Sequence, residues 1–286
     1  MSTAGAARTP TSPAGIALRV VAVASVLGWS VAPALWQALT ALKPDAQITQ
    51  VPTVYWPNPM TWEHVTTLWE RKPFGLYLAN STVVAVWATL LCVGVAALAA
   101  HALVRLPGRG RERLLLALLA VSLFPPILLL LPLYEGVRVL GWVNHPLALI
   151  VPYAALNLPL AVWVLESAFR QLPRELDEAG RVDGLSTFAR LRRIHLPLAM
   201  PSVATAAILV FIFCWNEFML ALTFMTHDAK KTVTAGIASV SGASLYEIPW
   251  GQLSAAIVIA TLPLVLLVLI FQRRIVSGLT RGAIKG

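Results

Sequence analysis

Three neighbouring residues place polar chemistry inside a long apolar run. Trp215, Asn216 and Glu217 set an aromatic ring, an amide and a carboxylate side by side. Aromatic faces pack against the C–H surface of a neutral sugar, and amides and carboxylates bond its hydroxyls. An ionisable group in hydrocarbon costs about 2.5–3.5 kcal/mol and usually faces a cavity or a partner. We therefore expect these residues to lie on a substrate pathway, with Asn80 and Asn157 as further candidates.

Two alternatives to sugar contact remain open for these residues. An asparagine in a membrane bundle often bonds a neighbouring helix. Glu217 could instead lie near the outer mouth of a span, where water reaches it.

Catalytic and metal chemistry are not indicated. Cys92 and Cys214 lie in apolar runs, without the spacing of a disulfide framework or a metal site. The sequence also lacks the GxxxxGK[ST] loop that cradles nucleotide phosphates. We therefore expect no catalytic residue, no metal site and no cofactor bound by this chain.

A charge-dense stretch, EAGRVDGLSTFARLRRIHLP at 178–197, lies between apolar runs and carries four arginines and two acids. Such a segment must lie in water or against another protein, because buried unpaired charges are costly. Apolar residues recur at helical spacing on both sides of Gly184. Gly184 permits a turn that a residue with a Cβ resists, and Ser186 or Thr187 can cap a second helix. The pattern predicts two short amphipathic helices joined at a glycine.

The composition indicates an integral membrane protein. The chain is 58% hydrophobic and 12% charged, with a mean hydropathy of +0.74, whereas charged residues make up about 25% of average soluble domains. Its net charge is +9. The basic residues fall in short segments between apolar runs and form no continuous face, so they indicate membrane topology and not a nucleic-acid partner.

Six apolar runs are long enough to cross a hydrocarbon core of about 30 Å. Residues 1–15 are expected to form a disordered tail, and residues 42–75 are too rich in proline to span. The spans are expected at about 16–41, 76–104, 114–134, 147–169, 201–225 and 253–271.

The positions of lysine and arginine predict the orientation. With the N-terminus inside, sixteen of the 22 basic residues fall on the inner side and six on the outer side. The positive-inside rule then places both termini and the 178–197 stretch in the cytoplasm.

The spacing of the charged stretch resembles the EAA loop of the membrane subunits of binding-protein-dependent ABC importers. That pattern is EAA, three residues, glycine, nine residues, isoleucine, one residue and Leu-Pro, and it is matched by Glu178, Ala179, Gly180, Gly184, Ile194, Leu196 and Pro197. The one departure is Gly180, where the family usually has alanine, and it could loosen the first short helix by about 1 kcal/mol. Weaker similarity elsewhere extends the resemblance to the smaller six-span subunit of maltose- and trehalose-type sugar importers.

The resemblance implies an all-α, type I ABC importer permease fold spanning 16–286, with a coupling loop at 170–200. In the family this loop inserts into a cleft of a cytoplasmic ATPase, where Glu178 would be the polar anchor and Asp183 would also belong to the coupling set. The implied partners are a second permease subunit, two copies of the ATPase carrying ATP and Mg²⁺, an extracytoplasmic solute-binding protein and membrane lipid. The implied location is the bacterial cytoplasmic membrane.

The expected function is therefore import of a sugar, such as the disaccharides trehalose or maltose. Two alternatives remain open: a permease for a polyol or glycerol phosphate, and an ion-coupled secondary transporter. The latter would be expected to have paired intramembrane ions and internal repeats, whereas this sequence has a single buried acid and no evident repeat.

Overall fold

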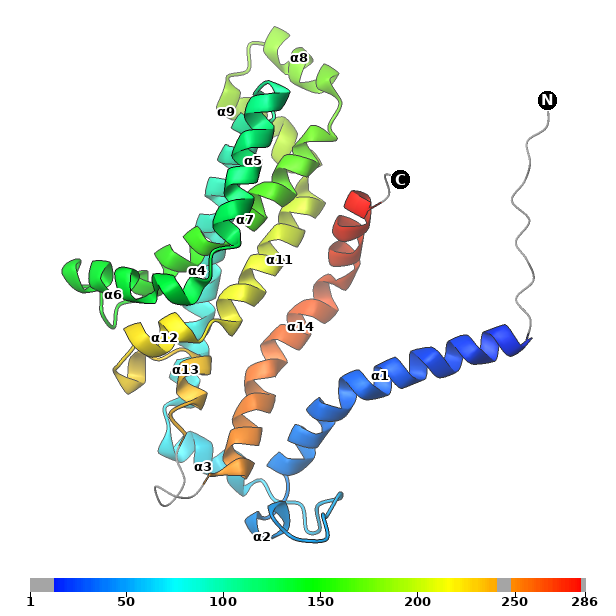
Figure 1. Cartoon of the computed structure of the whole chain (residues 1–286), viewed down its shortest axis with the longest axis vertical. Helices are drawn as coiled ribbons and strands as arrows, with labels where there is room; N and C mark the ends of the chain where they lie inside the picture. The colour runs from blue at the N-terminus through cyan, green and yellow to red at the C-terminus, as the bar shows by residue number, and fades with distance from the viewer. Residues whose placement is uncertain (1–12, 241–247, 284–286) are drawn as a thin grey trace. The chain divides into compact units, whose positions relative to one another are not determined.

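The computed structural model describes residues 13–240 and 248–283, and every regular element in these ranges is a helix (Figure 1). The expected all-α fold is thus confirmed. The chain divides into two compact units, Met1–Leu68 with Gly242–Val258, and Trp69–Ser241 with Ile259–Gly286. Most of the expected disordered tail, residues 1–12, lies outside the described residues.

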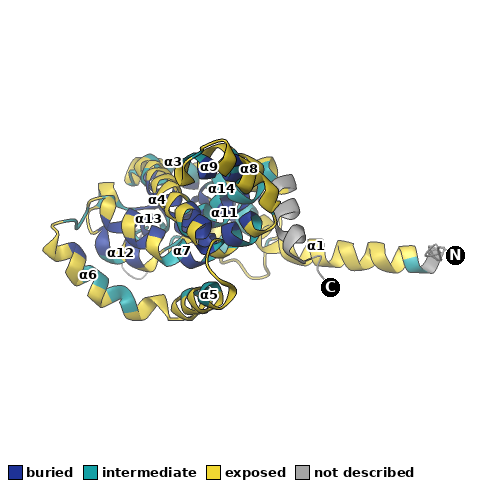
Figure 2. Cartoon of the chain, turned by 90° about the horizontal axis from the view of Figure 1, so that it is seen from above, coloured by how far each residue is buried: buried dark blue, intermediate teal, exposed yellow. Residues whose placement is uncertain are grey.

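The first unit holds helix α1 (Pro13–Ala41), followed by α2 (Asp45–Ile48) and most of α3 (Glu63–Arg71). Helix α1 begins three residues before the expected start at Ile16. Its apolar side chains are exposed along most of its length (Figure 2), with Trp29 87% exposed. A helix that is apolar all round belongs in lipid or against other apolar surface.

The loop after α1 is held by contacts within the first unit. The Lys43 ammonium lies 4.1 Å from the centre of the Trp36 ring. The Lys43 carbonyl oxygen lies 2.7 Å from His64 Nε2.

The core of the second unit is a bundle of α4 (Phe74–Leu103), α7 (Leu147–Arg170) and α11 (Met200–Asn216), which pack against one another. Small residues line these contacts and let the helix backbones approach closely, as is typical of helix packing in membranes. The buried alanines include Ala85, Ala88, Ala96, Ala97 and Ala100 of α4, Ala148 and Ala161 of α7, and Ala206 of α11.

The expected third span, 114–134, is bent and does not form one straight helix. Helix α5 (Gly108–Ser122) ends before Pro125, and the chain resumes as η1 (Pro126–Leu129) and α6 (Leu130–Val139), bent by 82° from α5. Two consecutive prolines lack the N–H groups that would continue the helix, so the chain turns there.

The expected fifth span, 201–225, is interrupted as well. Helix α11 ends at Asn216, Glu217 is extended, and the short α12 (Met219–Phe224) follows. Beyond it come η3 (Asp228–Lys230) and α13 (Val233–Ile237). Among the described residues, four helices are long and apolar enough to span a membrane, and up to six spans result if each bent pair counts as one.

The 170–200 segment forms α8 (Arg174–Val182), α9 (Thr187–Arg190), the π-helical turn η2 (Leu191–His195) and α10 (Leu196–Leu198). In Figure 1, α8 and α9 lie at one end of the second unit's bundle, and α12 and α13 lie toward the other end. We call residues 174–198 the coupling element.

Candidate functional site

The first helix of the coupling element, α8, follows Pro173 and has Glu175 and Asp177 in its first turn. Acidic side chains there interact favourably with the partial positive charge of a helix N-terminus. At the other end, the Gly184 N–H donates to the Arg181 carbonyl (3.1 Å), and the Leu185 N–H donates to the Gly180 carbonyl (2.9 Å). This pair of bonds is a Schellman motif, which stops α8 and turns the chain.

Gly184 is required at this turn by the backbone and not by crowding. Its φ is +74°, a conformation that residues with a Cβ rarely adopt. A Cβ built at Gly184 would meet nothing within 4 Å. The predicted glycine turn between two short helices is therefore present.

The second half of the coupling element begins with a side-chain cap. Ser186 Oγ accepts a hydrogen bond from the Ala189 N–H at 3.2 Å and so caps α9. The chain then widens into η2, continues through α10, and bends by 84° into α11.

Gly180 lies at the contact between the two halves of the element. It is buried, and a Cβ there would lie 2.7 Å from Ile194 Cδ1 and 3.2 Å from Arg190 Cδ. The absence of a Cβ at Gly180 therefore allows η2 to pack closely on α8. This packing is a separate effect from the lower helix propensity of glycine in α8.

A polar network that the sequence reasoning missed joins the coupling element to α4. Asp177 Oδ1 accepts a hydrogen bond from Arg190 Nε at 3.0 Å and lies 3.3 Å from His195 Nε2. His195 Nδ1 lies 2.8 Å from Nδ1 of His101, a buried residue near the end of α4. Arg105, just beyond α4, adds an ion pair to Asp177 at 3.7 Å.

The protonation of this network follows from its geometry. Burial lowers the pKa of His195, and the neighbouring Asp177 carboxylate opposes that shift. A neutral His195 that donates from Nε2 to Asp177 can accept at Nδ1 from His101. The network therefore links α8 and η2 to α4 through hydrogen bonds. Spacing alone could not have revealed it, because its members lie far apart in the sequence.

Several side chains on the outer surface of the coupling element are exposed. Glu178, Ala179 and Asp183 are exposed, and neither acid forms an ion pair with another described residue. Val182 and Phe188 are 88% and 62% exposed. Of the other predicted residues, Ile194 and Leu196 are half-buried and Pro197 is exposed.

Glu217 lies at the break between α11 and α12 and not within a helix. Its Oε1 accepts from the Leu220 N–H at 2.8 Å, and its Oε2 accepts from the Ala221 N–H at 3.1 Å and from the Tyr153 hydroxyl. The Thr234 hydroxyl donates to the Glu217 carbonyl at 2.7 Å. The carboxylate thus caps α12 and holds it to α7, which explains how the acid is accommodated here.

The other predicted pathway residues also have protein partners. Trp215 is buried, stacks on Phe211 and donates from its indole to the Ala260 carbonyl at 3.2 Å. The amides of Asn157 and Asn216 each donate to a carbonyl in their own helix at 2.8 Å. Asn80 donates to the carbonyls of Ala229 and Lys231, which ties α4 to the segment after α12.

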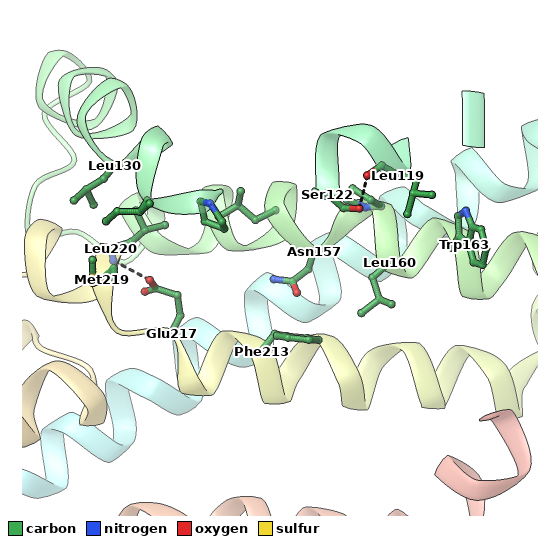
Figure 3. Close-up of a pocket in the computed structure, with 14 residues that line it drawn as sticks. Leu119, Ser122, Leu130, Asn157, Leu160, Trp163, Phe213, Glu217, Met219 and Leu220 are labelled. Atoms are coloured by element: carbon green, nitrogen blue, oxygen red, sulfur yellow. Dashed lines mark hydrogen bonds between the residues drawn. The ribbon is translucent and has the colours of Figure 1, made fainter. Parts of the chain in front are cut away.

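A cavity of about 500 Å³ brings two of the predicted pathway residues together. Glu217 and Asn157 supply polar groups to a largely apolar lining that comes from α5, η1, α6, α7, α11 and α12. In Figure 3 the Asn157 amide lies between Glu217 and the end of the cavity marked by Trp163. Asn80, Trp215 and Asn216 are not among its lining residues. We call this space the Glu217 cavity.

Solved structures share this arrangement of helices. One chain of the crystal structure of a bacterial ABC transporter involved in the import of the acidic polysaccharide alginate aligns with a TM-score of 0.74 at 19% identity, covering 93% of this chain and 99% of that one. A second structure of the alginate transporter, in complex with an alginate pentasaccharide-bound periplasmic protein, aligns with a TM-score of 0.65 at 14% identity, covering 90% and 91%. The fold is that of an ABC importer permease.

Sequence relatives cover nearly the whole chain. The trehalose/maltose transport system permease protein MalG of Thermococcus litoralis is 42% identical, covering 89% of this chain and 91% of its own. The sulfoquinovosyl glycerol transport system permease protein SmoH of Agrobacterium fabrum is 39% identical over 95% of both chains. The trehalose transport system permease protein SugB of Mycobacterium tuberculosis is 37% identical, covering 91% and 94%. Together with the match of residues 76–281 to the family described as binding-protein-dependent transport system inner membrane component, these similarities show that the chain belongs to that family of multi-pass inner-membrane permeases.

Proposed function

We propose that this chain is a permease subunit of an ATP-driven importer that carries a sugar, a di- or oligosaccharide such as trehalose or maltose, across the cytoplasmic membrane. The coupling element is the single observation that carries the proposal. It presents exposed Val182 and Phe188 on two short helices joined by a Schellman turn. Behind them, Asp177 and His195 connect the element to α4.

The coupling element docks in a groove of a cytoplasmic ATPase, with Glu178 as its polar anchor and Ala179, Gly180, Asp183, Gly184, Ile194, Leu196 and Pro197 completing the motif. ATP and Mg²⁺ bind to the ATPase subunits and not to this chain. Closure of two ATPase copies would move the element as a rigid piece. The Asp177 network would pass that movement to α4, and the direct chain connection at Ala199 would pass it to α11.

The remaining partners follow from the family. A second permease subunit completes the pathway, a solute-binding protein delivers the sugar from outside, and both termini lie in the cytoplasm. Of the predicted pathway residues, Asn157 and Glu217 are the two we place on the pathway, because both line the Glu217 cavity.

The sugar is proposed from the relatives, two of which are named for trehalose. A third is named for sulfoquinovosyl glycerol, so a sugar glycoside is a second candidate cargo. A polyol or glycerol phosphate permease is the next alternative.

Uptake into proteoliposomes tests the proposed function. The assembled transporter is expected to import radiolabelled trehalose or maltose only with ATP inside, with the soluble binding protein outside, and with sensitivity to vanadate. Uptake driven by an ion gradient without ATP would instead support a secondary transporter.

A further inference from the structure

A second cavity, of about 700 Å³, lies next to the Glu217 cavity. The two cavities share Leu160 and Trp163, which lie on α7, as part of their linings. Trp163 is 53% exposed, so about half of its surface is accessible in this chain. A solute leaving the Glu217 cavity along α7 would therefore pass Trp163 and enter the second cavity, which we call the Glu166 cavity.

One oxygen of the Glu166 carboxylate, Oε1, is a buried acceptor without a hydrogen-bond donor among the described residues. Its side chain is 6% exposed, and Oε1 accepts no hydrogen bond from any residue that the structure describes. Nε of Arg111 and Nε of Arg170 lie 3.4 and 3.9 Å from Oε1, close enough to balance its charge but without hydrogen-bond geometry. Oε1 is itself covered by its neighbours, so a bound molecule reaches it only when an arginine side chain moves aside. A buried acceptor left without a donor costs about 1–3 kcal/mol, and a hydroxyl that reached Oε1 would recover that cost.

The other polar groups of the Glu166 cavity define what such a molecule would be. Arg111 and Arg170 are matched in charge by Glu112 and Glu166, so the lining carries no net charge. The hydroxyls of Ser167 and Ser202 and the amide of Gln171 complete the polar lining. A mixture of donors and acceptors of balanced charge suits neutral hydroxyl groups, and the Trp163 ring suits the C–H face of a sugar.

The position of the Glu166 cavity connects it to the coupling element. Its walls include Leu172, which precedes α8, and Leu198 with Ala199, which follow η2. Both ends of the coupling element therefore border the same space. A movement of the element would change the shape of the cavity directly.

We propose that the Glu166 cavity is a second, coupling-side binding site for a neutral polyhydroxyl solute, in which Glu166 Oε1 accepts a sugar hydroxyl and Trp163 packs against the ring. This proposal rests on the proposed function. The solute would occupy the site after the Glu217 cavity and leave it when the coupling element moves.

Protection of a cysteine from labelling tests occupancy of the site. Ser202→Cys is introduced into the assembled transporter in nanodiscs, trehalose is added as the probe, and maleimide labelling of residue 202 is followed by mass spectrometry, with maltose in a parallel series. Trehalose or maltose should slow labelling in a saturable manner. Thr66→Cys, an exposed position on α3, is the matched control and should label at the same rate with and without sugar. Ser167→Cys, also in the lining, serves if the first variant does not assemble.

Glu166→Gln and Trp163→Ala are then added to the labelled variant. Loss of a hydrogen bond to a charged acceptor should raise the half-protecting sugar concentration about tenfold, and loss of the ring should also raise it. Glu135→Gln on α6 and Trp87→Ala on α4 are matched controls that should not change it, because neither residue lines the Glu166 cavity.

The outcomes separate this proposal from the proposed function. If the transporter imports sugar but residue 202 is never protected, or if protection is the same in Glu166→Gln, the second site is refuted and Glu166 only pairs α5 with α7. If the transporter imports neither trehalose nor maltose with ATP and binding protein, the proposed function fails as well. Protection that depends on Glu166, with import intact, supports both.

Discussion

Replacing Gly180 by alanine tests why this chain has glycine where an EAA loop usually has alanine. Alanine gains about 1 kcal/mol over glycine inside a helix. Against that gain, the new Cβ would stand 2.7 Å from Ile194 Cδ1. Displacing the end of an isoleucine from its rotamer costs about 0.5–1.5 kcal/mol. The two effects nearly cancel, so Gly180→Ala alone should change the stability of the coupling element by less than about 1 kcal/mol.

Removing the Cδ1 methyl group of Ile194 should reveal the stabilisation that alanine at position 180 brings to the helix. Ile194→Val deletes Cδ1 and leaves Arg190 Cδ and Cγ, at 3.2 and 3.3 Å, as the nearest atoms to the new Cβ. Arg190 can yield by a few tenths of an ångström without losing its bond to Asp177. In the valine background, Gly180→Ala should therefore stabilise the element by about 1 kcal/mol, and the double-mutant cycle should give a coupling energy of similar size.

Limited proteolysis measures this local stability in the assembled transporter. Trypsin cuts after the arginines of the coupling element when the element opens, and the cutting rate follows the free energy of opening when closing is fast. A gain of 1 kcal/mol should slow cleavage about fivefold. Cleavage at Arg71 is the internal control. Equal effects of Gly180→Ala in the isoleucine and valine backgrounds would refute the close-packing explanation.

Three further changes test other parts of the site. Gly184→Ala should destabilise the coupling element by about 1–2 kcal/mol through its positive φ, seen as faster tryptic cleavage without loss of membrane insertion; unchanged cleavage would contradict the strained turn. Asp177→Asn should weaken the hydrogen-bonded link to α4 and leave Arg190 without its ion pair, so that ATP hydrolysis continues with less sugar import per ATP. Tightly coupled import would show that this link plays no part in the mechanism. Tyr153→Phe should cost about 1 kcal/mol by removing one donor to Glu217, measured by thermal unfolding of the purified transporter, and no loss would mean that the contact contributes nothing.

The coupling element could be predicted because its signals are local. The glycine at 184 and the cap at Ser186 act within a few residues of where they stand. Spacing located the glycine and narrowed the cap to Ser186 or Thr187. The role of Gly180 could not be predicted in this way. It depends on Ile194, which the turn brings back onto α8.

The directions of two bends could not be predicted, because hydropathy measures how apolar a run is and not which way it points. Residues around Pro125 and Pro126 stay apolar through an 82° change of direction. The presence of proline alone does not determine whether a helix breaks, since α7 continues through Pro152 and Pro159, both buried in the bundle. The break at Glu217 depends on a carboxylate that bonds the next helix and Tyr153, and such partners are visible only in three dimensions.

A photo-crosslink from the tip of the coupling element tests the central claim most directly. Phe188, 62% exposed on α9, is replaced by a benzoyl-phenylalanine in the assembled transporter, and Leu131, 72% exposed on α6, serves as the matched position. Irradiation should join residue 188 to the cytoplasmic ATPase subunit, and residue 131 should give no ATPase adduct. An adduct of residue 188 with lipid or with the extracytoplasmic binding protein, and none with the ATPase, would contradict the account.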